Sequence, residues 1–406
     1  MSAIRSHTAP VFRPCTAATW ADPWPMYAAL RAHDPVHHVV PEDRPAHDYW
    51  VLTRHADVVA AARDTATFSS RDGLTVEYGE LERIGLTANP PLVMQDPPQH
   101  TEFRTLVARG FTPRRVESLE PMVRAYVRER LDRLGGAGDI VEVLFKPLPS
   151  MVVAHYLGVP EQDRERFDGW TDAVVAAGTG TTTERARAAS TEMVGYFAEL
   201  IRRRRAEPGD DTVSLLVQAG LGATDEDVTG LVQLLAYTWT MVAGGNDTTT
   251  GLLGGAVQLL HANPAQRDAL AAEPGLIRPA IEEFARLTSP VQGLARTTTR
   301  AVEIAGVTIP AGRKVLLVYA SANRDERVFG PDAADLDVTR DPQHLLTFGH
   351  GPHHCLGAAA ARMQARVAMA ELLARYPRFV VDHDAVEYAD GPYVRRPTRV
   401  PFRGAA

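Results

Sequence analysis

The longest run of regular apolar spacing in the chain extends from Val228 to Ala262 and predicts one long helix. Thr224 to Asp227 forms a capping box ahead of this helix, and Asn263-Pro264 stops it. Val228 to Asn246 carries no charge, which leaves a membrane span as one alternative. The run then continues into Asp247 to Thr250 and holds many small residues, so we favour a central helix buried on all sides.

Helical spacing also dominates the rest of the chain, whereas the alternation that is typical of strands is confined to a few short segments. Further helices are predicted at residues 24–32, 55–68, around 100–104, 116–134, 140–158, 167–177, 184–205, 265–272, 275–287 and 358–373. Strands are predicted at 49–53, in a small meander over 298–317, and in the tail at 379–401. Two long segments, 69–98 and 323–348, are predicted to be irregular, and the first has the length of a lid or binding loop.

No internal repeat or shift in composition divides the sequence, so we predict one mainly α domain with minor β over residues 1–406. Residues 1–20 are expected to form a loosely ordered arm. With 45% hydrophobic residues and a net charge of −7, the chain has no general attraction to nucleic acid or anionic membranes. The first residues show no apolar signal or anchor, and Cys15 and Cys355 lie in unrelated segments, so we expect a cytoplasmic protein.

The loop from Phe348 to Gly357 presents one cysteine directly ahead of the predicted 358–373 helix. Unpaired N–H groups at a helix start favour an anionic thiolate at Cys355, and the flanking glycines allow close approach to a large, flat group. Such a thiolate is either a nucleophile or a metal ligand. A packing cysteine and a zinc site with His350, His353 or His354 are alternatives, although zinc usually takes four ligands with paired spacing.

Polar residues within the long helix form a second constellation, Gly244-Gly245-Asn246-Asp247-Thr248-Thr249. Small residues let a flat molecule lie against the backbone, and an acid followed by an alcohol offers a proton path into an apolar interior. Taken alone, these polar side chains would more often bond to the preceding helical turn. Two further pairs, His100 with Arg104 and Glu283 with Arg286, have the spacing of neighbours on one helix face.

The pattern Phe348-x-x-Gly351-x-His353-x-Cys355-x-Gly357 resembles the haem-binding signature of the cytochromes P450, the haem-thiolate monooxygenases. The other motifs follow in family order over nearly the whole chain. The resemblance implies the P450 fold of soluble bacterial members, with haem b (iron protoporphyrin IX) between the long central helix and the cysteine loop. It also implies that Cys355 is the axial iron ligand, with Phe348, Gly349 and Gly357 beside it.

The same resemblance assigns roles to the remaining motifs. Thr248 and Asp247 become the proton relay, Ala243 and Gly244 border the cofactor, and Gly245 opens a groove for oxygen. Buried propionates of haem need fixed donors, which the resemblance places at His100, Arg104, Arg296 and His353. Glu283, Arg286 and Arg340 become a structural ion-pair lock behind the loop.

The implied activity is insertion of one oxygen atom from O₂ into an apolar substrate. Its electrons would come from a ferredoxin and ferredoxin reductase fed by NAD(P)H, because the sequence holds no flavin or nicotinamide fingerprint. Candidates for a basic docking face are Arg109, Arg114, Arg115, Arg362 and Arg366. The alternatives are a peroxide-driven haem enzyme and a haem-thiolate sensor or ligand carrier.

The expected substrate contacts lie in the 71–99 loop, the 170–190 region, the central helix and the tail. The residues singled out are Val93, Met94, Val242, Val291, Leu294 and Tyr393. Their apolar character favours a terpenoid, steroid, fatty-acyl or polyketide-type molecule.

Overall fold

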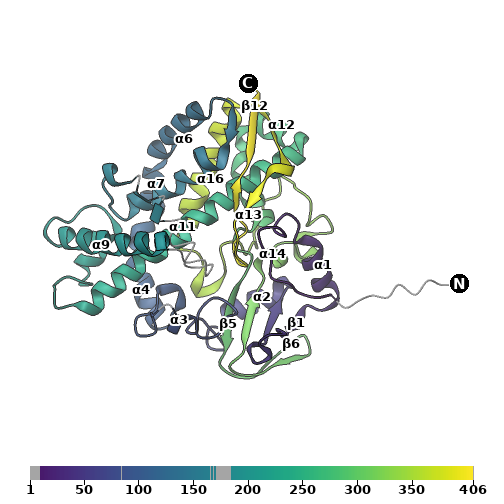
Figure 1. Cartoon of the computed structure of the whole chain (residues 1–406). Helices are drawn as coiled ribbons and strands as arrows, with labels where there is room; N and C mark the ends of the chain where they lie inside the picture. The colour runs from purple at the N-terminus through teal and green to yellow at the C-terminus, as the bar shows by residue number, and fades with distance from the viewer. Residues whose placement is uncertain (1–9, 84, 165, 168, 171–183, 406) are drawn as a thin grey trace.

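The computed structural model describes residues 10–405 except 84, 165, 168 and 171–183. Helix α11 (Val228–Ala262) crosses the centre of the molecule, with α7 (Pro147–Tyr156), α13 (Ile277–Thr288) and α16 (Ala358–Arg375) around it (Figure 1). Together with α6 (Glu120–Leu134), these helices build the largest hydrophobic cluster. A second cluster joins α7 and the first half of α11 to α9 (Glu184–Ala206) and α10 (Thr212–Gln218).

Two halves of α11 have different surroundings. Every residue from Thr249 to Gln258 is buried, which confirms the expected buried helix for this half. The first half leaves Ala243 and Gly244 exposed on one side. Asp227, rather than Thr224, caps the helix, because its side chain accepts a hydrogen bond of 2.9 Å from the Gly230 N–H. Among the described residues, none of the helices has the length and apolar character needed to cross a membrane.

The remaining helices are α1 (Trp24–His33), α2 (His55–Arg63), α3 (Glu80–Arg83), α4 (Gln99–Ala108), α5 (Pro113–Ser118), α12 (Pro264–Ala272), α14 (Tyr319–Ala322) and α15 (Glu326–Phe329). Some of them follow the predicted positions with shifted ends, whereas α3 and α15 are short helices inside the two segments predicted to be irregular and α14 was not predicted. The helix predicted at 55–68 ends early because Asp64 turns the chain, and Phe68–Ser69 then joins a sheet as β3. A π-helical turn, Val141–Phe145, precedes α7 inside the predicted 140–158 helix. The predicted 167–177 helix lies largely outside the described residues.

A five-stranded sheet lies beside the helical part, in the order β1-β2-β8-β5-β3. Its strands are β1 (Val36–Val39), β2 (Tyr49–Leu52), β8 (Lys314–Leu317), β5 (Leu294–Thr298) and β3, and only the β2–β8 pair is parallel. The tail supplies β9 (Arg378–Val381) and β12 (Pro401–Ala405), which form a sheet with β4 (Ala137–Asp139). Two small hairpins complete the strands, β6 (Val302–Ile304) with β7 (Val307–Ile309) and β10 (Glu387–Tyr388) with β11 (Pro397–Arg399). The mainly α fold with minor β is therefore confirmed.

The segment from residue 10 to residue 20 differs from the predicted loose arm. Phe12, Cys15 and Trp20 are buried, and the Trp20 indole N–H donates to the Gly391 carbonyl at 2.9 Å. Arg395 donates in turn to the Trp20 carbonyl at 2.6 Å. The expectation of a loose arm is wrong for these residues, because tail residues far along the chain give the segment a surface to pack on.

Candidate active site

The cysteine loop is a tight turn that lies against α2. The Cys355 N–H donates to the Phe348 carbonyl at 2.7 Å, and Gly349 and Gly351 adopt φ values of 70° and 68°. A Cβ on Gly351 would lie 2.7 Å from the Ala62 carbonyl oxygen, so only glycine allows this approach. The turn leaves Cys355 exposed as a residue just ahead of α16, although surrounding protein atoms desolvate its sulfur.

Two opposing influences act on the thiol. Burial of the sulfur among protein atoms raises the pKa of Cys355, while the N–H groups of Gly357 and Ala358 and the charges of Arg104 and Arg362 lower it. The pKa is raised overall, so the helix start that was expected to favour a thiolate is outweighed by burial. A cation held against the sulfur would reverse this balance.

Four basic side chains converge beside the loop. The rings of His100 and His353 lie 4.2 Å apart, and His353 Nε2 lies 3.2 Å from the Ser70 hydroxyl. Burial, followed by the charge of Arg296, lowers the pKa of His353 to about 3, so this imidazole is neutral. Arg104, on α4 with His100, donates to the His354 carbonyl. Burial is the largest influence that lowers the pKa of His100.

Within the described residues, no carboxylate forms an ion pair with any member of this basic cluster, although Asp96 lies close enough to influence the pKa of His100. Arg296 is only 3% exposed, and its one hydrogen bond within the described residues goes to the carbonyl of neighbouring Ala295. Buried His100 Nδ1 also has no hydrogen-bond partner in the described part of the chain. A buried guanidinium without a counter-charge is costly, so the cluster fits a ligand that brings carboxylates. The expected donors His100, Arg104, Arg296 and His353 are thus brought together.

The acid–alcohol pair lies near the middle of α11, with Thr248 on the side of exposed Gly244 and Asp247 on the side covered by the tail. The Thr248 hydroxyl donates to the Gly244 carbonyl at 2.9 Å, and a Cβ on Gly244 would meet nothing within 4 Å. Gly245 faces elsewhere, since a Cβ there would lie 2.5 Å from Val153 Cγ2 of α7. Asp247 forms an ion pair of 3.1 Å with Arg396 Nε of the tail. Nothing in the sequence singled out Arg396, because its partner lies about 150 positions away.

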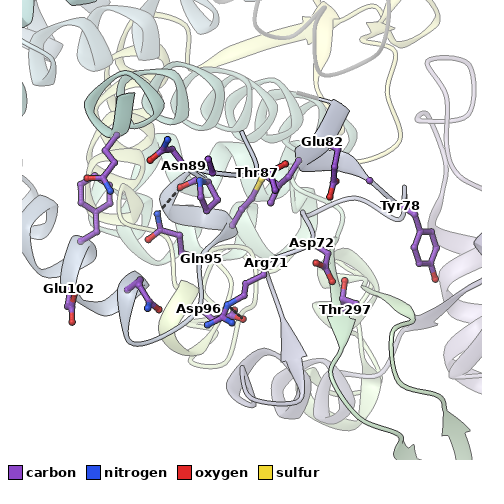
Figure 2. Close-up of a pocket in the computed structure, with 18 of the residues that line it drawn as sticks. Arg71, Asp72, Tyr78, Glu82, Thr87, Asn89, Gln95, Asp96, Glu102 and Thr297 are labelled. Carbon is purple, nitrogen blue, oxygen red and sulfur yellow. Dashed lines mark hydrogen bonds and ion pairs between the residues drawn. The ribbon is translucent and has the colours of Figure 1, made fainter. Parts of the chain in front are cut away.

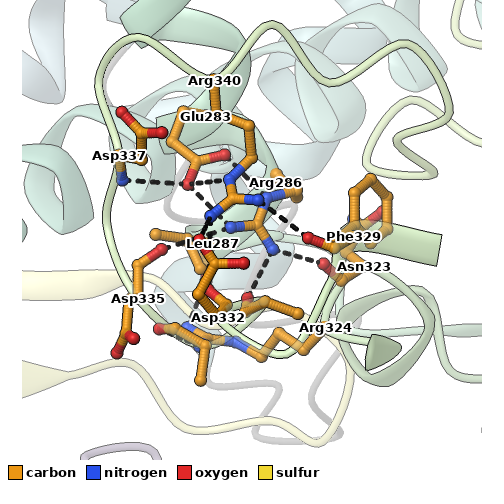
Figure 3. A network of polar contacts seen from close by, with 12 residues as sticks. Glu283, Arg286, Leu287, Asn323, Arg324, Phe329, Asp332, Asp335, Asp337 and Arg340 are labelled. Carbon is orange, nitrogen blue, oxygen red and sulfur yellow. Dashed lines mark hydrogen bonds and ion pairs between the residues drawn. The ribbon is translucent and has the colours of Figure 1, made fainter. Parts of the chain in front are cut away.

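Glu283 and Arg286 form a fully buried ion pair with two contacts of 2.7 Å (Figure 3). Arg286 also donates to the carbonyls of Asn323 and Ala333, and Arg340 reaches Glu283 at 3.3 Å. These contacts bind the 323–340 segment, which contains α15, to α13. Asn323 continues the connection toward the cysteine loop, because its amide oxygen accepts from the Leu346 N–H at 2.6 Å.

A cavity of about 790 Å³ lies next to α4, beneath the 71–96 segment (Figure 2). Met94 lines it together with Leu81, Phe103 and Leu106, but polar side chains form much of its wall, including Arg71, Asp72, Tyr78, Glu82, Asn89, Gln95, Asp96 and Glu102. Val93 and Leu294 are half-buried but are not among the residues that line this cavity. The other expected substrate contacts pack against protein in this conformation.

Those remaining contacts have identifiable neighbours. Val242 is fully buried in the cluster of α7, α9 and α11. Val291 forms a β-bridge with Val394, and the Tyr393 hydroxyl accepts a hydrogen bond of 2.9 Å from the Val76 N–H. Tyr393 therefore fastens the 71–96 segment to the tail.

The expected basic docking face is partly neutralised. Arg362 forms an ion pair with Glu282, Arg366 with Glu120, and Arg115 with Asp210. Arg109 and Arg114 form no ion pair within the described residues. The zinc alternative finds no support there either, because no group of three or more His, Cys, Asp or Glu side chains is placed to hold a metal ion.

An exposed cysteine, a cluster of buried donors that form no ion pair within the described residues, and an acid–alcohol pair on a long central helix define a haem-thiolate class of site. The family description "Cytochrome P450" matches residues 275–398. The chain is 63% identical over 407 residues to Cytochrome P450 130 of Mycobacterium tuberculosis, with 99% of each covered. It is 38% identical to the Vitamin D(3) 25-hydroxylase of Pseudonocardia autotrophica, with 94% of each covered.

Among solved structures, the cytochrome P450 PksS of the Bacillus subtilis bacillaene polyketide synthase is similar to this chain with a TM-score of 0.86. Its sequence is 28% identical, and the match covers 98% of this chain and 100% of that one. The chain therefore belongs to the cytochrome P450 family. It is a monooxygenase with a haem cofactor, which confirms the family and the enzyme class expected from the sequence.

Proposed function

We propose that this enzyme hydroxylates or epoxidises an apolar small molecule in a site formed by Cys355, the α11 face at Ala243 and Gly244, and the basic cluster. For hydroxylation, substrate RH, O₂, two electrons and two protons give ROH and water. The haem supplies O₂ activation when bound, and a thiolate ligand favours O–O cleavage. The observation that carries the proposal is that buried Arg296 and His100, on the side of Cys355, form no ion pair within the described part of the chain.

We assign haem b, held without covalent bonds to the chain. The second cysteine, Cys15, is buried next to Tyr27 and Thr19 and is no candidate for covalent attachment. Cys355 would ligate the iron, with Phe348, Gly349 and Gly357 beside it. His100, Arg104, Arg296 and His353 would face the propionates, where neutral His353 donates or accepts one hydrogen bond without adding charge.

Thr248 and Asp247 would move protons toward the site. The Thr248 hydroxyl donates its hydrogen bond to the Gly244 carbonyl, which leaves its oxygen lone pairs able to accept a hydrogen bond from the reacting side. Asp247 lies next in the chain and can exchange protons as a carboxylate. This acid–alcohol pair favours the O₂-dependent reaction over a peroxide-driven one.

For the substrate we propose a polycyclic or polyketide-type metabolite that carries polar substituents. Relatives named for vitamin D(3) and for a polyketide synthase support this class. The 790 Å³ cavity supports it too, since it combines Met94, Phe103 and Leu106 with amide and carboxylate side chains. An acidic ferredoxin could still contact Arg109 and Arg114, and salt should weaken that contact.

The test is the absorption spectrum of the reduced, CO-treated protein. We expect the Soret maximum at the thiolate position in the native chain and its loss in Cys355→Ala, with Cys15→Ala as the matched control that keeps it. Product formation with NADPH, ferredoxin and ferredoxin reductase then separates a monooxygenase from a carrier. A native chain without the thiolate spectrum, or one that turns over only with peroxide, would overturn the proposal.

A further inference from the structure

Arg396 forms a largely buried ion pair with the carboxylate that we assign to the proton relay. Its Nε lies 3.1 Å from Asp247 Oδ1, and the two side chains are only 10% and 15% exposed. We propose that Arg396 is a positioning residue, which keeps Asp247 ionised and fixed one residue from Thr248. This inference rests on the proposed relay role of Asp247.

Glycines on α11 allow the tail to come this close. A Cβ on Gly251 would lie 2.9 Å from the Arg395 carbonyl oxygen, and one on Gly254 would lie 2.4 Å from Pro397 Cγ. These glycines follow Asp247 by four and seven positions, so all three share one face of the helix. The backbone on both sides of Arg396 therefore lies directly on α11, with the guanidinium directed to the turn that holds Asp247.

The tail is also fastened on its other sides. The Arg395 N–H donates to the Pro290 carbonyl at 2.8 Å, and the Arg396 carbonyl accepts from the Ala389 N–H at 2.9 Å. The Arg395 side chain is occupied by the Trp20 carbonyl and the Tyr388 hydroxyl. The side chain of Arg395 therefore binds Trp20 and Tyr388, whereas the side chain of Arg396 pairs with Asp247.

The electrostatic consequence follows from burial. A mostly buried carboxylate without a counter-charge tends to take up a proton and stay neutral. A guanidinium remains charged at any working pH, so Arg396 keeps Asp247 as a carboxylate that can accept a proton and release it again. A lysine would keep the charge but not the shape of the guanidinium, so Arg396→Lys should retain part of the effect.

The experiment uses the haem-loaded enzyme with NADPH, O₂, ferredoxin and ferredoxin reductase, in H₂O and in D₂O. We compare Arg396→Gln, Arg396→Lys, Asp247→Asn and, as the matched control three residues further along the tail, exposed Arg399→Gln. In Arg396→Gln we expect the solvent isotope effect on NADPH consumption to rise and peroxide released per NADPH to increase about threefold to tenfold. Arg396→Lys should fall between this variant and the native enzyme, and Arg399→Gln should match the native enzyme.

A second readout is independent of turnover. Arg396→Gln should lower the melting temperature less in an Asp247→Asn background than in the native chain, because the pair is already broken. If Asp247→Asn changes the isotope effect and Arg396→Gln does not, the positioning role is overturned while the relay stands. If Asp247→Asn also changes nothing, the relay itself fails. A melting shift with unchanged isotope effect and peroxide yield would reduce Arg396 to a structural tie, which also overturns the inference.

Discussion

The burial of the Arg296 side chain is visible in the structure but not in the sequence. The resemblance to the family implied that Arg296 is a propionate donor, but any one arginine is more often a surface charge. Strand β5 pairs with β8 and β3 and is buried from Ala295 to Thr298, which takes the guanidinium away from water. Burial without a carboxylate within the described residues is therefore a finding of the fold, and it turns a common residue into a specific anion site.

Replacing Arg296 by methionine removes this charge and keeps much of the side-chain volume. Since an unpaired buried charge destabilises a chain, the haem-free form of Arg296→Met should be as stable as the native one or more so. Haem should dissociate at least about tenfold faster, because a propionate loses its partner. The measurement is the rate of haem transfer to an excess of apomyoglobin, together with urea unfolding of the haem-free chains.

The control for this change is Arg300→Met, two residues after the end of β5. The Arg300 side chain is 68% exposed and approaches Asp64 only at 3.9 Å, so its loss should leave haem release near the native rate. Equal rates of haem release in the two variants would contradict the role assigned to Arg296.

At the scale of elements, periodicity predicted most helices but not which face of each helix is covered by neighbouring elements. The length of α11 followed from its apolar spacing, whereas the different surroundings of Gly244 and Gly245 did not. A Cβ on Gly245 would meet Val153, whereas one on Gly244 would meet no described residue within 4 Å, because neighbours contributed by other helices decide which face is covered. The cap of the helix is Asp227 rather than Thr224, the first residue of the predicted capping box. Several side chains near residue 225 are able to cap a helix, and the local sequence does not choose between them.

The contact between α6 and α16 contains a carboxylate that is strongly perturbed. Hydrogen bonds from Arg366 and Arg124 lower the pKa of Glu120 to about 2, from an ordinary value of 4.5. The folded-state pKa is depressed, so Glu120 stabilises the fold above about pH 4.5 and this contribution is lost as the pH falls toward 2. After allowance for its partly exposed position, we expect ionised Glu120 to contribute about 1–2 kcal/mol to the free energy of unfolding.

Glu120→Gln should therefore be less stable than the native chain at pH 6, and the gap in the free energy of unfolding should close as the pH approaches 2–3. Urea unfolding of both chains over this pH range measures the gap. Glu117→Gln is the matched control, because Glu117 is exposed on α5 and forms no ion pair within the described residues. A gap that stays constant with pH would show that Glu120 acts through packing rather than through its charge.

At the scale of the whole molecule, the two ends of the described chain depend on each other. Composition suggested a loose N-terminal arm, because a segment rich in Pro and Thr has no periodicity of its own. The contacts that order residues 10–20 come from the tail, about 370 positions away, where Gly391 and Arg395 bind Trp20. Local pattern carries no signal of such a distant partner. The same tail brings Arg396 to Asp247. The sequence therefore failed to predict both the packing of Trp20 and the role of Arg396 for one reason, which is that their partners lie far away in the chain.

Trp20→Ala tests this connection across the molecule. Trp20 is fully buried, so truncation should cost about 3–5 kcal/mol in the free energy of unfolding. Exposed Val11, at 55%, is the matched control, and Val11→Ala should stay close to the native value. Because the Trp20 backbone and indole hold Arg395 and Gly391, amide hydrogen exchange over residues 388–397 should also become faster in Trp20→Ala. Equal stability and equal exchange in the two variants would mean that the segment is as loosely attached as its sequence suggests.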